Sequence, residues 1–247
     1  MRFRFHRITA IALVALTESM RKDVRSTGLA ILYAVVVANT TAQEATVTVT
    51  RGINVVAQVK VAPNNAKVVQ LPYVDALVTP TINEAGPSRV VVDGSYRLRS
   101  NQPVTVYQYE PYDYTAQNLF SFTNDASLLL PVNTWSGNYI VASYYHWPFQ
   151  GFNVPGFYAV VARQDNTKVT LLPSATGKSI VPGGGVAANG TGVVMLNEGD
   201  VLEVFTQSLK LEVMRMLRVA CMPNYLADIA LCRQSYLQRK ALWSQSA

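Results

Sequence analysis

The chain has 247 residues, of which 49% are hydrophobic and 15% are charged. This charged fraction is well below the roughly 25% that is usual for soluble domains, and abundant Val, Thr and Tyr favour strands over surface helices. Residues 1–27 and 209–247 each hold six basic and two acidic side chains, whereas residues 28–208 hold nine basic and eleven acidic ones. Because the net charge of +6 comes from the two ends, the body lacks the clustered Lys and Arg that bind nucleic acid, and we expect no nucleic-acid partner.

Two short apolar runs lie near the start of the chain, at residues 8–17 and 28–38, and basic residues precede each of them. Both are shorter than the roughly 20 apolar residues that span a bilayer as a helix. After the second run, Thr40 and Ala42 are small residues at positions −3 and −1 of a signal-peptidase site before Gln43. This arrangement predicts an export signal.

The predicted division of the N-terminal region places an upstream extension at residues 1–19 and a signal peptide at 20–42 that starts at Met20. The alternative is an uncleaved anchor helix over 28–42. In both cases we expect a secreted or cell-surface protein that contacts a membrane only through its N-terminal segment.

From about residue 45 the chain alternates apolar and polar residues with the period of two that is typical of strands. Asp93-Gly94 separates two such segments and predicts a hairpin turn, because both residues tolerate positive φ. Predicted strands cover 46–49, 53–61, 66–72, 89–92, 95–100, 103–110, 138–146, 156–163, 167–173, 193–196 and 200–207. The predicted fold class is therefore all-β: an antiparallel β-sandwich-like domain or paired sandwiches over 43–208, preceded by a signal helix.

Residues 209–247 are richer in Leu, Met, Ala and Arg, and we expect a continuation that begins as a strand and becomes helical after Pro223. This segment contains the only two cysteines, Cys221 and Cys232. Export permits a disulfide between them, which would close a small loop.

No pattern in the sequence selects a catalytic or metal site. After removal of the predicted leader His146 is the only histidine, and neither a G-x-S-x-G elbow nor a calcium-binding D-x-[DN]-x-[DN]-G string occurs. Carboxylate pairs for sugar hydrolysis are available but no local pattern picks out two of them. We therefore predict no catalytic residue, no metal ligand and no cofactor.

Aromatic side chains are concentrated in the middle of the chain, where sixteen of the 24 Phe, Trp and Tyr residues lie between Tyr96 and Tyr158. One interpretation is that alternate tyrosines fill the core and the others keep their hydroxyls in water. The other is a binding surface, because flat amphipathic rings give contact area at low cost in entropy. The candidate ligand-binding residues are Tyr109, Tyr112, Tyr114, Tyr145 and Trp147.

The run RSNQPVTVYQYEPYDYTAQNLFSFTNDASLLLP, residues 99–131, resembles the signature of the IgGFc-binding protein N-terminal domain family. Its matching parts are Pro103 to Gln108 and the motif from Ser121 to Pro131. The resemblance extends over about 45–208, weakens afterwards, and suggests that the chain ends inside the family's domain. Within the motif, we expect Asn124 and Asp125 to bond local backbone and hold a tight turn.

The resemblance implies a bacterial, exported, non-enzymatic adhesion or recognition module with an extracellular protein or glycan as its partner. Two alternatives stay open: a carbohydrate-processing hydrolase on a β scaffold, and a structural component of a surface layer. Exposed rings would favour recognition, whereas two carboxylates about 5 to 10 Å apart in one cleft would favour hydrolysis.

Overall fold

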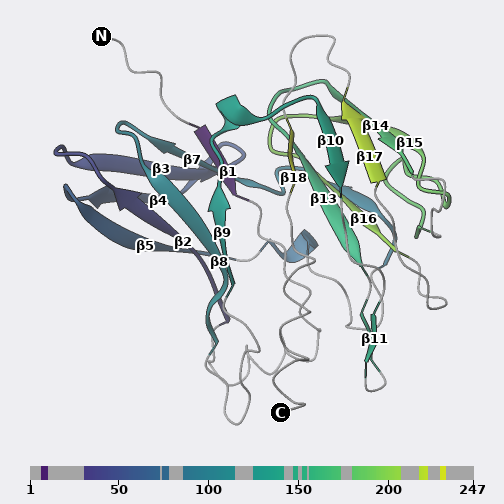
Figure 1. Cartoon of the computed structure of the whole chain (residues 1–247), viewed down its shortest axis with the longest axis horizontal. Coiled ribbons are helices and arrows are strands. Elements are labelled where there is room, and N and C mark those ends of the chain that lie inside the picture. Colours follow the sequence, from purple (N-terminus) through teal and green to yellow (C-terminus); the bar gives the residue numbers. More distant parts are fainter. Residues whose placement is uncertain are drawn as a thin grey trace.

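The computed structural model describes residues 7–10, 31–72, 74–77, 86–114, 125–141, 147–149, 152–154, 156–173, 180–206, 217–221 and 229–231. These residues form antiparallel sheets and two short 3-10 turns, η1 (Asp75–Leu77) and η2 (Val132–Thr134). The all-β prediction is confirmed, and four four-stranded sheets lie in two lobes, seen on the left and right of Figure 1.

The first lobe, or first sandwich, is made of sheets I and II. Sheet I has the order β1 (Arg7–Ala10), β7 (Tyr96–Ser100), β3 (Ala45–Arg51) and β4 (Asn54–Val61). Sheet II has the order β5 (Asn65–Leu71), β2 (Ile31–Asn39), β8 (Thr105–Tyr114) and β9 (Asp125–Leu129). Alternate residues of both sheets, such as Val47 and Val49 on β3 and Val35 and Val37 on β2, point inward and form one core.

The second lobe, or second sandwich, is made of sheets III and IV. Sheet III has the order β18 (Ile229–Leu231), β13 (Phe157–Ala162), β16 (Val201–Phe205) and β6 (Arg89–Val91). Sheet IV has the order β10 (Asn138–Val141), β17 (Leu217–Cys221), β14 (Thr167–Leu172) and β15 (Gly192–Leu196). A separate hairpin pairs β11 (Trp147–Phe149) with β12 (Phe152–Val154).

Sheet III is buried on both of its faces. Val160 and Leu202 belong to the core that it shares with sheet IV, whereas Ala159, Val161 and Val201 belong to the core of the first sandwich. Consecutive residues of β13 and β16 are therefore apolar, as expected for strands that are covered on both sides.

The apolar run that predicts a signal or anchor helix contains a strand instead. Residues 31–39 form β2, which pairs with β5 on one side and β8 on the other, and Val35 and Val37 are fully buried. Basic residues before an apolar run are compatible with a leader, but a central strand has the same composition. The helical part of the fold prediction is wrong over these residues.

The connection from β2 to β3 carries the chain from sheet II to sheet I through a bonded turn. The buried Asn39 donates through Nδ2 to the carbonyl oxygens of Gln43, at 2.8 Å, and Val61, at 3.1 Å. Its Oδ1 accepts the Thr41 N–H at 3.0 Å. The predicted cleavage site between Ala42 and Gln43 lies within this turn.

The predicted hairpin at Asp93-Gly94 is also wrong, although a turn is present there. The preceding strand β6 pairs with β16 in sheet III, whereas the following strand β7 pairs with β3 and β1 in sheet I. Asp93 has φ of 49°, so the residue has the left-handed conformation expected for Asp in a turn, but the turn connects the two sandwiches.

The described parts of the C-terminal region are strands. Leu217–Cys221 form β17, in agreement with the predicted strand at the start of this segment. Ile229–Leu231 form β18 beside β13, although the sequence predicts a helix here. The strand is favoured over the helix because its backbone forms ladder hydrogen bonds with the open edge of the sheet.

Candidate functional site

The structure distributes the predicted aromatic residues over separate elements. Tyr109, Tyr112 and Tyr114 lie on β8 in sheet II, and the Tyr109 side chain is half-buried. Trp147 lies on β11, in the separate hairpin, and Tyr145 lies outside the described residues. The tyrosines of β8 therefore share one sheet, but Trp147 is not on it.

Among the residues whose side chains the structure describes, the outward surface of sheet II, which we call the sheet II outer face, is uncharged. Val106 and Gln108 of β8 point into the core, so Tyr107 and Tyr109 point outward. The outward residues with described side chains are Ala34, Val36, Ala38, Ala66, Val68, Gln70, Thr105, Tyr107, Tyr109, Ala126 and Leu128. None of them is ionisable except through the tyrosine hydroxyls.

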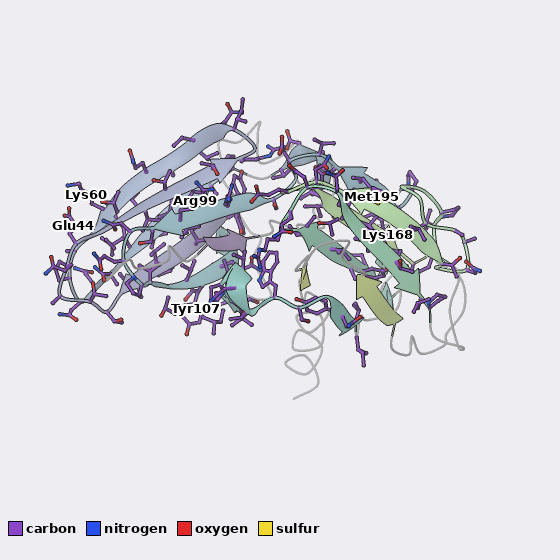
Figure 2. The ribbon with its side chains drawn as sticks, turned by 90° about the horizontal axis from the view of Figure 1, so that it is seen from above. Glu44, Lys60, Arg99, Tyr107, Lys168 and Met195 are labelled. Atoms are coloured by element: carbon purple, nitrogen blue, oxygen red, sulfur yellow. The ribbon has the colours of Figure 1, made fainter. Side chains whose placement is uncertain are left out.

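Four of these side chains lie directly opposite one another across all four strands. Val68 pairs with Val36, Val36 with Tyr107, and Tyr107 with Leu128. Val68, Tyr107 and Leu128 are 38%, 39% and 51% exposed. We call Val68, Val36, Tyr107 and Leu128 the apolar row. In Figure 2, Tyr107 lies on the side of the first sandwich opposite to Arg99 of sheet I.

The binding residues predicted from the sequence include no member of the apolar row, not even Tyr107. The alternation in Val106-Tyr107-Gln108-Tyr109 would have placed both tyrosines on one face. The sequence does not reveal that Val36, Val68 and Leu128 lie beside Tyr107, because the pairing of β5, β2, β8 and β9 joins segments far apart in the chain.

A pocket of about 280 Å³ lies between the two sandwiches. The turn after β3, the start of β7, η2, and the turns around β13 and β16 contribute to it. Its lining residues are Gly52, Ile53, Asp93, Ser95, Arg97, Val132, Ala162, Arg163, Asp165, Glu198 and Gly199.

Hydrogen bonds between the lobes fix the walls of this pocket. The Asp93 N–H donates to Asp200 Oδ1 at 3.2 Å, and Ser95 Oγ donates to the Gly199 carbonyl oxygen at 3.0 Å. Arg97 of sheet I forms an ion pair with Glu198 at 2.9 Å. The turns between strands of different sheets therefore also hold the two sandwiches together.

A buried ion pair lies on the side of sheet III that faces the first sandwich. Arg89 Nε donates to Glu203 Oε2 at 2.9 Å, and the Arg89 guanidinium lies over the Phe205 ring, 5.3 Å from its centroid. Glu203 is only 1% exposed. Burial raises the pKa of Glu203 to about 7, although Arg89 opposes the shift.

The glycine-rich segment beside this pair has a packing function. A Cβ at Gly184 would lie 2.8 Å from Arg89 Cα, and Gly184 has φ of 56°. The adjacent Gly183 lies against the Ser88 carbonyl. Only residues without a side chain can approach β6 this closely.

The remaining predicted residues are only partly described. Asp125 is the first residue of β9, and Asn124 lies outside the described residues. Cys221 ends β17, opposite Val169 of β14, and Cys232 is also outside the described residues. Among described residues, no three or more His, Cys, Asp or Glu side chains are placed to hold a metal ion. No described helix is long and apolar enough to cross a membrane.

The described residues define an all-β protein built from two antiparallel sandwiches, with a pocket between them that is lined by charged side chains. Residues 125–211 match the model of a family described as IgGFc binding protein, which confirms the predicted resemblance over this part of the chain. The match begins at β9 and includes all of β10 to β16. No curated protein and no solved structure matches the chain.

Proposed function

We propose that this chain is an exported, non-enzymatic module that binds an extracellular protein through the sheet II outer face. The observation that carries the proposal is the apolar row, in which Val68, Val36, Tyr107 and Leu128 are in register across four strands. The match of residues 125–211 to a family named for binding the Fc part of immunoglobulin supports a protein as the partner.

Isolated exposed apolar side chains are ordinary on protein surfaces, but contiguous ones are not. The centre of a protein–protein interface is depleted in charged residues and enriched in tyrosine. The sheet II outer face has this composition, with Tyr107 and Tyr109 side by side on β8. Covering its described side chains with a partner would remove the row from water without burying an unpaired charge among them.

The aromatic residues selected from the sequence belong to the proposal in two groups. Tyr109 belongs to the sheet II outer face, and Tyr112 and Tyr114 lie farther along the same strand, β8. Tyr145 and Trp147 would form a second contact region, since Trp147 is on the β11–β12 hairpin.

The test is a binding measurement of the purified full chain against immobilised immunoglobulin Fc, mucin and a glycan array. We expect saturable binding to a protein ligand. The double variant Tyr107→Ala/Leu128→Ser should weaken it by a factor of about ten or more, because central interface residues typically contribute more than about 1.4 kcal/mol each when they are hot spots.

The matched control is Val193→Ser/Met195→Ser on sheet IV. Both side chains are exposed and apolar, and Met195 lies in the other lobe from Tyr107 in Figure 2. Binding that depends on the control residues and not on Tyr107 and Leu128 would contradict the proposed surface. Hydrolysis of a glycan probe would favour the enzyme alternative.

Self-association is a further outcome of the same experiment, because an uncharged face can also pair with a second copy of itself. Sedimentation velocity over a range of concentrations separates the two cases. Assembly without ligand that Tyr107→Ala/Leu128→Ser abolishes would assign the face to a structural component of a surface layer and refute recognition.

A further inference from the structure

The pocket between the two sandwiches is not used by the proposed surface. We propose that it binds an organic cation, the ammonium or guanidinium group of a Lys or Arg side chain presented by a partner protein. The proposal depends on the charges left available in the pocket, on how Asp93 is presented, and on the apolar rim.

Both arginines that line the pocket already have partners. Arg97 is paired with Glu198 at 2.9 Å, and Arg163 Nη1 donates to the Val132 carbonyl oxygen at 3.2 Å. All three of Arg97, Arg163 and Glu198 also make further interactions. The remaining ionisable groups of the lining are therefore two carboxylates, Asp93 and Asp165.

Asp93 is held by its backbone and presents its side chain. Its N–H is bound by Asp200, and its carbonyl oxygen accepts a 2.8 Å hydrogen bond from Arg51 Nε. Within the described part of the chain, no hydrogen bond or ion pair involves its carboxylate. A carboxylate in a pocket gains most from a charged donor, so a cation is the complementary ligand.

Gly52 leaves space for this carboxylate, and Gly199 lies beside it at ordinary contact distance. A Cβ at Gly52 would lie 2.6 Å from Asp93 Oδ2, and one at Gly199 would lie 3.5 Å from Oδ1. Asp165 lies on the wall from the second sandwich and uses Oδ1 to accept the Glu198 N–H at 3.0 Å. The pocket therefore offers acceptors from both lobes.

The rim favours a side chain over a bare ion. Ile53 lines the pocket and is 97% exposed, and the nearby Val92, next to Asp93, is also exposed. Lys and Arg bury their methylene stems along apolar surface while the charged end is hydrogen-bonded. A volume of about 280 Å³ is at the lower limit of small-molecule sites, which suits one side chain.

The test titrates the full chain with four blocked amino acids, and binding is followed by NMR shifts or calorimetry. They are the Nα-acetyl amides of arginine, lysine, citrulline and glutamate. Citrulline keeps the shape of arginine without its charge. We expect saturable binding of one or both cations, and binding of the citrulline compound at least about tenfold weaker, because charge-assisted hydrogen bonds contribute most of the difference.

The informative variant is Asp93→Asn, because Asn also tolerates positive φ and keeps the turn. It should weaken cation binding by about tenfold, whereas Glu44→Gln, which removes a charge on the first sandwich outside the pocket lining, should not. A thermal melt confirms that each variant is folded, and Asp165→Asn provides an independent second variant from the other lobe.

Equal binding of the citrulline and arginine compounds, or no saturable binding by the folded protein, would overturn the proposal. A preference for Nα-acetyl-glutamate amide would also overturn it and assign the pocket to anions through Arg97 and Arg163. Tyr107→Ala/Leu128→Ser should leave cation binding unchanged, so the pocket and the sheet II outer face can fail separately.

Discussion

Sheets II and III are both four-stranded and antiparallel, but they use apolar residues differently. On sheet III the apolar residues of both faces are covered, one by sheet IV and the other by the first sandwich, where Val161 and Val201 join the core. On sheet II the inward residues are covered by sheet I, but on the other face Val68, Tyr107 and Leu128 of the apolar row are exposed and Val36 is half-buried.

The difference indicates what an apolar sheet face requires. The apolar residues of β13 and β16 that face the first sandwich are buried by the packing of the two lobes, so contacts within the chain account for their apolar character. Among the described residues, none covers the apolar row in this way. Under the proposed function, a binding partner covers this row.

The largest effect should come from removing β2 from sheet II. A chain that starts at Gln43, the predicted mature N-terminus, would lose the strand that pairs with both β5 and β8. We expect this chain to fail to fold cooperatively, because the buried Tyr33, Val35 and Val37 leave the core together.

Circular dichroism and thermal melts would compare this chain with one that starts at Gly28. Intact-mass analysis of the natively produced protein gives the complementary result. A cooperative melt of the chain that starts at Gln43 would contradict the structure of sheet II and favour cleavage after Ala42.

The next effect tests whether sheet III is covered on its second face. Val161→Asp places a charge in the junction between the two sandwiches and should lower the free energy of unfolding by roughly 3 to 5 kcal/mol. Val193→Asp on the exposed side of sheet IV should cost less than about 1 kcal/mol. Urea denaturation measures both; similar losses would show that the first sandwich does not cover β13.

Local signals in the sequence were sufficient to predict most of the strands in the structure. The alternation in β3 and β8 and the polar turns around them depend on neighbouring residues only, so the predictions for 46–49 and 103–110 agree with the structure. The pairing of strands could not be predicted in this way. Asp93-Gly94 has hairpin chemistry, yet it connects sheets III and I, because the partners of β6 and β7 are far away in the sequence.

The same limit applies to β2 and to the candidate sites. An apolar run after basic residues fits both a leader and a central strand, and only the pairing of β2 with β5 and β8 distinguishes them. The sequence identified β8 as an aromatic strand. It could not identify the pocket, because Arg97 of the first sandwich meets Asp165 and Glu198 of the second only when the two lobes are assembled.

The third effect concerns Glu203, an ionisable side chain that is buried on sheet III. The pKa of Glu203 is raised to about 7 in the folded protein from 4.5, so ionising this group costs the folded state free energy that the unfolded chain does not lose. The contribution of Glu203 to the free energy of unfolding should therefore be highest below pH 4.5. It should decrease as the pH rises to about 7.

The Glu203→Gln variant removes this contribution. As the pH rises from 4.5 to 8, the original chain should lose stability relative to the variant. The difference between their unfolding free energies should change by on the order of 3 kcal/mol. Urea denaturation at several pH values gives this difference. A difference that is constant with pH would show that the pKa of Glu203 is the same in the folded and unfolded chain, with Arg89 offsetting the effect of burial.

The smallest effect on stability should come from the apolar row itself. Leu128→Ser removes an exposed side chain from the edge strand β9, and we expect the free energy of unfolding to change by less than about 0.5 kcal/mol. The same substitution should weaken binding to the protein partner, since it lies in the proposed interface. A residue that matters for binding and not for folding distinguishes the outer face of sheet II from that of sheet III. A loss of stability comparable to that of Val161→Asp would instead mean that the row is covered within the folded chain, and the proposed binding surface would have to be abandoned.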